Sequence, residues 1–204
     1  MKKILIALVS VLLVAPVVSN AQSDTSEETM KYAKKMEKEM EKDGWKLFGS
    51  SYMLHDVLAK HHAKLESLGN GARELSATAF GSNRQKNLLI QQASTNAFNA
   101  YAGECRKVVG MEVIDLELSK EERTHFLATY QSKVEAEIQG ELQLSFIIIR
   151  ETKGDEVEAQ VFYVVDEAAA ERARVRALEI ATEGMNLTSE MSDKLNQVVR
   201  KHVK

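Results

Sequence analysis

The stretch that decides the fold is ELQLSFIIIRETKGDEVEAQVFYVVD, residues 141–166. In each half every second residue is apolar, which predicts two strands that each bury one face. Lys153 and Gly154 suit a two-residue loop, so we expect an antiparallel hairpin. That loop would place Leu144 opposite Tyr163 and Phe146 opposite Val161. The residues expected on the buried face are Leu142, Leu144, Phe146, Ile148, Val157, Ala159, Val161, Tyr163 and Val165.

The opposite face of this hairpin mixes apolar with polar residues, so we expect it to be only partly covered. Its apolar members are Ile147, Ile149, Phe162 and Val164. An apolar face without full cover is a candidate binding surface. We therefore take Trp45, Ile147, Ile149 and Phe162 as the candidate ligand or partner surface.

Two further segments supply strands that can pair with the hairpin. Residues 45–48 form a short strand anchored by Trp45, and residues 73–80 alternate in part. Residues 84–109 predict a long helix whose small apolar side chains allow close packing on a sheet. We expect an α+β fold with a small, mostly antiparallel sheet of about four strands, helices packed on one face and this long Ala-rich helix at the centre. The other expected helices are 27–43, 54–68, 120–139, 167–182 and a last one from about 189.

The N-terminal segment has the pattern of a secretory signal peptide. A basic start precedes an apolar run from Ile4 to Val14, and small residues lead to a cut after Ala21. The run is shorter than the span of about 20 residues that crosses a membrane, and an uncleaved anchor is the alternative. The expected organisation is a signal peptide at 1–21, a charged helix at 22–43, a single α+β domain at 44–183 and an amphipathic helix at 184–204.

Composition excludes several classes of protein. The 204 residues are 44% apolar and 28% charged, with a net charge of −3, which argues against disorder and against a strongly basic nucleic-acid binder. The single proline, Pro16, lies in the signal peptide, so glycines must make the turns of the domain. The single cysteine, Cys105, cannot form an internal disulfide, and we expect it buried on a helix.

No recognised catalytic motif occurs. The chain has no Gly-x-Ser-x-Gly turn and no phosphate-binding glycine loop. His55 and His61 are six residues apart, so one helix does not place them on one face, and Glu121 with His125 lacks a third metal ligand. We therefore assign no catalytic, cofactor-binding or metal-binding residue and expect no cofactor. A glycosidase-type carboxylate pair stays open.

Two charged helices have alternative interpretations. Residues 31–43 form either a solvated helix that caps the domain or a partner-binding helix, and we favour the first. The C-terminal helix carries Lys194, Arg200, Lys201, His202 and Lys204 beside one apolar side. We favour packing of this helix on the domain over docking on an anionic membrane surface.

These segments together resemble a family of functionally uncharacterised exported proteins of Bacteroides-type bacteria, which is distantly similar to the small Helicobacter surface lipoproteins. The resemblance lies in Asp43-Gly44-Trp45-Lys46, in the segment from Glu74 to Gly81, in the Ala-rich helix and in residues 157–166 with the helix that follows. It implies an envelope location and an α+β domain with one long helix on a small sheet. It carries no active site, and this chain lacks the lipid-accepting cysteine of the lipoproteins.

These observations predict an exported, non-enzymatic protein of the periplasm or outer membrane that binds or assembles with an unknown envelope component. We expect no nucleic-acid partner, and peripheral membrane contact stays open, as does the oligomeric state. One alternative is a hydrolase that acts on envelope material through carboxylates that the sequence does not single out. Another is a carrier of small apolar ligands, which predicts an apolar cavity near Ile147, Ile149 and Phe162.

Overall fold

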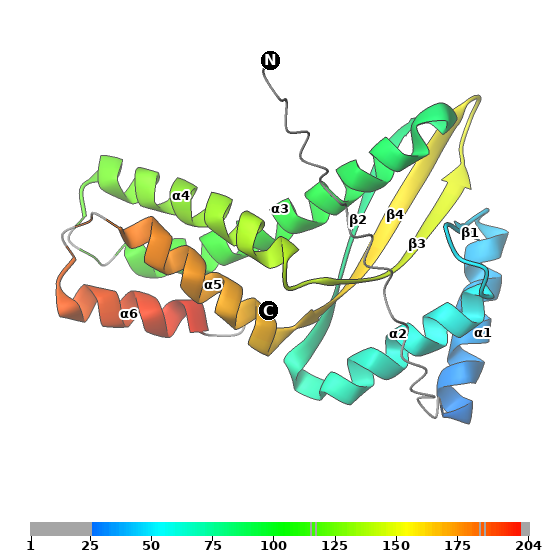
Figure 1. The fold of residues 1–204 in the computed structure, drawn as a ribbon, viewed down its shortest axis with the longest axis horizontal. Helices are drawn as coiled ribbons and strands as arrows, with labels where there is room; N and C mark the ends of the chain where they lie inside the picture. Colours follow the sequence, from blue (N-terminus) through cyan, green and yellow to red (C-terminus); the bar gives the residue numbers. More distant parts are fainter. Residues whose placement is uncertain (1–25, 115, 117, 184, 186, 201–204) are drawn as a thin grey trace, which may run out of the picture.

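The computed structural model describes residues 26–114, 116, 118–183, 185 and 187–200 (Figure 1). The expected signal peptide lies outside these residues, as do Lys201, His202 and Lys204. The helices in the described part are α1 (Glu27–Lys42), α2 (Leu54–Leu68), α3 (Lys86–Val113), α4 (Lys120–Gln139), α5 (Glu167–Thr182) and α6 (Ser189–Arg200). The strands are β1 (Lys46–Leu47), β2 (Ala72–Ser82), β3 (Gln143–Glu151) and β4 (Glu156–Asp166).

The four strands form one antiparallel sheet in the order β1–β3–β4–β2. β2 pairs with β4 without interruption, from Ala72 opposite Asp166 to Ser82 opposite Glu156. β1 pairs with β3 through Lys46 and Leu47. The α+β class, the four-stranded antiparallel sheet and the long central helix are therefore confirmed, and both partner strands lie where the sequence predicts them.

The predicted register of the hairpin is right at one pair and wrong at the next. Leu144 lies opposite Tyr163 as expected, but Phe146 lies opposite Phe162 and not opposite Val161. The cause is an irregularity in β3 between Leu144 and Phe146, where one extra residue forms a β-bulge.

The extra residue is Ser145, and it changes which side chains of β3 share a face. Because side chains alternate with a period of two, one added residue moves all later side chains to the other side of the sheet. Ile147 and Ile149 therefore lie opposite Val161 and Ala159 and contact the large hydrophobic cluster. Phe146, Ile148 and Phe162 belong instead to a second cluster on the opposite face.

Helices cover both faces of the sheet, whereas the sequence predicted cover on one face. The first half of α3 packs on the face that carries Leu75, Ala79 and Val161. α2 covers the other face through Leu54, Leu58 and Ala59, and α1 packs on α2 and adds Ala33 to the same cluster. The physical reason is the bulge, since it places the large side chains of Phe146 and Ile148 beside Phe162, and that apolar surface needs cover.

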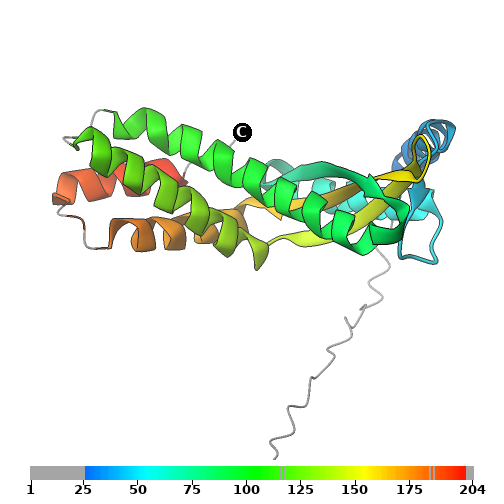
Figure 2. The same ribbon diagram turned by 90° about the horizontal axis from the view of Figure 1, so that it is seen from above.

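α3 continues past the sheet and joins α4, α5 and α6 in a helical end of the molecule (Figures 1 and 2). Its 28 residues span about 42 Å at about 1.5 Å per residue. The large cluster runs without a break from the sheet into this bundle. The C-terminal helix contributes Leu195, Val198 and Val199 to it, so its predicted packing on the domain is confirmed.

A buried cation ties three of these helices together. Arg174 of α5 is 1% exposed. Its Nη1 donates to the hydroxyl of Tyr101 on α3 at 2.7 Å, and its Nε donates to the carbonyl of Val199 on α6 at 2.6 Å. Its Nη2 pairs with Glu167 at the start of α5. The hydrogen bonds satisfy a charge that would otherwise be costly to bury.

Helix ends follow local signals that the sequence carries. Ser119 and Glu122 form a reciprocal capping box at the start of α4. The Ser26 hydroxyl accepts the N–H of Thr29 at 3.1 Å at the start of α1. Gly44 has a φ of 83°, a left-handed conformation that glycine adopts without strain, and it follows the end of α1.

Candidate functional site: a groove between α2 and β3

An open groove of about 880 Å³ separates α2 from the outer edge of β3. This size lies within the range of about 300–1,000 Å³ typical of ligand sites. Its walls come from the connection between β1 and α2, from one side of α2 and from the first half of β3. The lining residues are Leu47, Phe48, Gly49, Ser50, Tyr52, Val57, Lys60, His61, Lys64, Gln143, Leu144, Ser145, Phe146, Ile147 and Val164, most of them apolar.

The groove exists because the chain leaves the sheet after β1. Phe48 still donates its N–H to the carbonyl of Ile147 at 2.9 Å. Gly49 then adopts a φ of 71°, which a residue with a side chain would adopt only with strain. The following residues cross to the start of α2 and do not continue along β3.

The start of α2 is held in place by a carboxylate from α1. Glu37 accepts the N–H of His55 at 3.1 Å through one oxygen, and its other oxygen lies 2.8 Å from His55 Nδ1. A carboxylate at a helix N-terminus satisfies free N–H groups and complements the helix dipole. This contact fixes α2, and with it one wall of the groove, relative to α1.

His61 of α2 reaches from the groove across the sheet and is 2% exposed. Its Nδ1 lies 2.8 Å from Ser145 Oγ on β3, and its Nε2 lies 2.8 Å from Glu74 Oε2 on β2. Because a carboxylate only accepts, Nε2 carries the proton, and in the neutral ring Nδ1 accepts from the Ser145 hydroxyl. The ring also packs edge-on against Phe146, with centroids 5.2 Å apart.

The charges that line the groove are positive. Lys60 and Lys64 lie one helical turn apart on α2, and no aspartate or glutamate is among the described lining residues. The Lys60 Nζ lies 4.3 Å from the ring centroid of Tyr52, in a cation–π contact. Tyr52 and Leu144 remain 55% and 49% exposed. The groove therefore offers apolar surface beside two cations.

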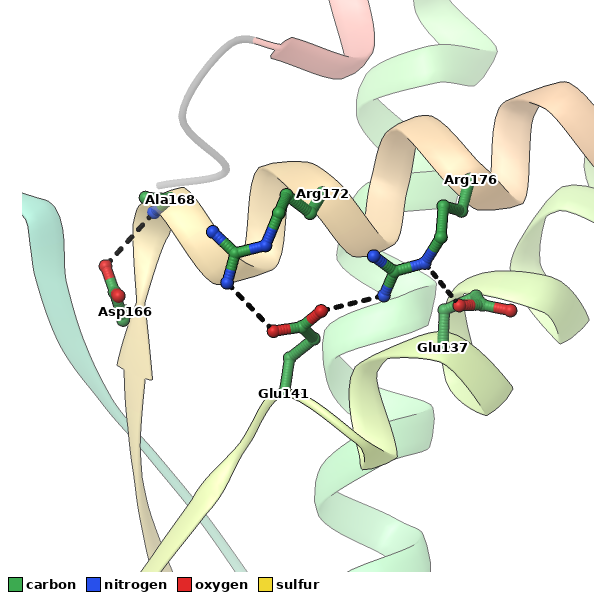
Figure 3. A network of polar contacts seen from close by, with 6 residues as sticks. All are labelled: Glu137, Glu141, Asp166, Ala168, Arg172 and Arg176. Atoms are coloured by element: carbon green, nitrogen blue, oxygen red, sulfur yellow. Dashed lines mark hydrogen bonds and ion pairs between the residues drawn. The ribbon is translucent and has the colours of Figure 1, made fainter.

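A smaller polar pocket of about 240 Å³ adjoins the groove at Lys64 and Gln143. Its wall includes Glu141, which accepts from Arg172 at 3.1 Å and from Arg176 at 2.8 Å (Figure 3). The hydrogen bond from Arg176, with help from Arg172, lowers the pKa of Glu141 below its usual value. These ion pairs fix α5 against the segment between α4 and β3.

The four side chains predicted as one surface do not share one. Trp45 is 9% exposed and lines a separate hollow of about 410 Å³, with the Arg150 guanidinium 4.5 Å from its ring centroid. Phe162 is buried in the second cluster, and Ile149 is half-buried against the first. Ile147 is the member of this set that lines the groove.

Sequence reasoning missed most of the groove. The position of His61 on the apolar side of its helix was the available signal that its ring points toward the sheet. The sequence held no such signal for Ser145, Lys60 and Lys64. These residues come together in the groove only because of the bulge in β3 and the path of the chain after Gly49.

The buried position predicted for Cys105 is confirmed, and burial raises the pKa of its thiol to about 12.

The described residues contain no cluster of three or more histidine, cysteine, aspartate or glutamate side chains that would suit a metal ion. Among the same residues, no helix combines the length and apolar character needed to cross a bilayer.

Comparison with protein-family models, with characterised proteins and with solved structures finds no match to this chain.

Proposed function

We propose that this chain is an exported, non-enzymatic binding or assembly module of the cell envelope and that the groove between α2 and β3 receives its partner. The observation that carries the proposal is the groove, which places exposed Leu144 and Tyr52 beside two lysines. Exposed apolar side chains gathered in a concave site are typical of binding surfaces. The signal-peptide pattern of residues 1–21 and the family resemblance support the envelope location.

The test is capture of an envelope partner that depends on the groove. The mature chain and its Leu144→Glu variant are cross-linked in envelope extracts of the source cell, and captured proteins are quantified. We expect Leu144→Glu to reduce capture of the partner at least tenfold, because it places a charge in the apolar wall.

Leu88→Glu provides the matched control, since Leu88 on α3 is 55% exposed and does not line the groove. This control is expected to retain capture. Equal capture by all three proteins would contradict a binding role for the groove, and so would the absence of any defined partner.

A hydrolase is the second candidate, and a specific contact favours it. Ser145, His61 and Glu74 form a chain of nucleophile, base and carboxylate with two contacts of 2.8 Å, at the edge of the groove. Triads are recognised by such geometry and not by their order in the sequence. The same contacts join α2 to β2 and β3, which gives them a structural role, so binding remains our first proposal.

Esterase activity separates the two candidates. The mature chain is incubated with p-nitrophenyl butyrate and with a fluorophosphonate probe, beside its Ser145→Ala variant. The binding proposal expects no hydrolysis and no labelling above the level of Ser145→Ala. Labelling that disappears in this variant would overturn the non-enzymatic assignment and establish the hydrolase.

A further inference from the structure

The outer edge of β3 is paired over only part of its length. β4 pairs with the inner edge of β3 from Gln143 to Glu151. On the outer edge β1 covers Ile148 and Ile149, and Phe48 adds one hydrogen bond to Ile147. From Gln143 to Phe146 this outer edge has no strand partner in the part of the chain that the structure describes. These four residues span about 13 Å at about 3.3 Å per residue.

This unpaired edge is also one wall of the groove. Gln143, Leu144, Ser145 and Phe146 all line it, and Val57, Lys60 and Lys64 of α2 stand opposite. A segment in the groove would thus lie between a strand edge and a helix. An open edge presents backbone N–H and C=O groups that an added strand can pair with, and extended peptides bind many proteins in this way.

Of the features that commonly prevent strand addition, this edge has the β-bulge at Ser145 but lacks two others. Residues 143–146 include no charged side chain and no proline. Leu144 is half exposed beside the groove. The bulge residue Ser145 directs its hydroxyl to His61, so its side chain is engaged within the protein.

We propose that an extended segment of a partner protein adds to β3 as a fifth strand along Gln143–Phe146, continuing the line of β1. This inference rests on the proposed binding function and specifies its partner. Side chains of the added strand alternate, so every second one enters the apolar groove. No carboxylate is among the described residues that line the groove, so Lys60 and Lys64 give it a positive charge. We expect them to favour a partner strand with an acidic side chain on the side that faces α2.

The first experiment selects peptides from a phage-displayed library of random twelve-residue sequences on the mature chain. Selected peptides are then tested for binding to Leu144→Glu, to Leu88→Glu and to the double variant Lys60→Glu, Lys64→Glu. We expect acidic peptides with alternating apolar residues. Their affinity should fall at least tenfold with Leu144→Glu and with the lysine variant and remain unchanged with Leu88→Glu. These exposed positions are chosen because they tolerate substitution without unfolding.

The second experiment tests strand pairing itself by NMR of the isotope-labelled chain with a selected peptide. We expect at least tenfold slower exchange of edge amides within Gln143–Phe146 and interstrand contacts between the peptide and β3. Groove-dependent binding without these signals would overturn strand addition, and so would a failure to select any groove-dependent peptide.

These failures are distinguishable from a failure of the proposed function, because capture of the envelope partner is measured separately. Dodecanoate, a single-chain anionic amphiphile, serves as a further probe. Binding of dodecanoate to the groove, with no groove-dependent peptide selected, would overturn strand addition and favour the carrier of apolar ligands.

Discussion

Phe146 of β3 stacks face to face on Phe162 of β4, with ring centroids 4.2 Å apart and an interplanar angle of 10°. The two residues are direct neighbours across the sheet. The pair belongs to the cluster between the sheet and α2, and the ring of His61 packs edge-on against both members. The bulge at Ser145 brings them together, so the same irregularity builds this cluster and shapes the groove.

Replacement of Phe162 by alanine should destabilise the protein strongly. Phe162 is 6% exposed, and its loss leaves a cavity between the sheet and α2. Such substitutions cost about 3–5 kcal/mol. Denaturant unfolding measures the change, and Phe80→Ala on β2 is the control, since Phe80 is 63% exposed and its loss should cost about 0.5 kcal/mol or less. Similar losses for both variants would contradict the packing described here.

Two buried tyrosines of the helical end should respond differently to the same substitution. The Tyr101 hydroxyl accepts from Arg174 at 2.7 Å, so Tyr101→Phe should cost about 1.5–3 kcal/mol, the range for bonds to charged groups. The buried Tyr130 hydroxyl has no hydrogen-bond partner among the described residues. Tyr130→Phe should therefore leave the free energy of unfolding unchanged or raise it by about 1 kcal/mol.

Chemical denaturation of both variants provides the comparison, and each tyrosine serves as the control for the other. The free energy of unfolding of Tyr130→Phe should equal or exceed that of the parent chain. That of Tyr101→Phe should be lower than that of the parent chain. The reverse order, or equal losses, would disprove the role assigned to Arg174.

Cys105 should be inert to thiol reagents in the folded protein. Its side chain is fully buried, and burial raises its pKa to about 12, so the reactive thiolate is scarce. Labelling with a disulfide reagent should proceed only as fast as the protein opens. The control carries Cys105→Ala with Lys107→Cys, which moves the thiol to an exposed position on α3 and should react at once. Rapid labelling of Cys105 itself would show that the bundle is open.

Local signals account for the parts of the fold that the sequence predicts well. The predicted bounds of three helices coincide with the observed ones, at 54–68 for α2, 120–139 for α4 and 167–182 for α5. The reason is that apolar periodicity and capping residues such as Ser119 act within a few residues of the chain. The ranges of the strands follow from alternation in the same way. These features need no knowledge of distant contacts.

The features that the sequence did not predict depend on distant contacts. The bulge at Ser145 changes the register by one residue, and its hydroxyl contacts His61, 84 positions away. Alternation alone cannot locate such an insertion when apolar residues occupy both faces, as in Phe146–Ile149. The groove likewise joins a turn after Gly49 with α2 and β3, so no single stretch contains it.

His62 should make the stability of the protein decrease in mildly acidic solution. Burial of the ring, with a further contribution from neighbouring His61, lowers its pKa below the ordinary 6.5, although Glu74 and Glu66 oppose this shift. The unfolded chain takes up a proton near the ordinary value, so below pH 6.5 it binds more protons than the folded chain does. The free energy of unfolding therefore falls as the pH falls through this range, and the contribution is absent above it.

The measurement is the free energy of unfolding of the parent chain and of His62→Gln between about pH 8 and about pH 5. The parent should lose more stability than the variant over this interval, because the variant has no ring to protonate. His125→Gln, at an exposed position on α4, should follow the parent. A steeper loss of stability in His62→Gln than in the parent would mean that the folded protein stabilises the charged ring, which is the opposite of the expected effect. It would contradict the environment of the ring formed by Tyr32, Met36 and His61.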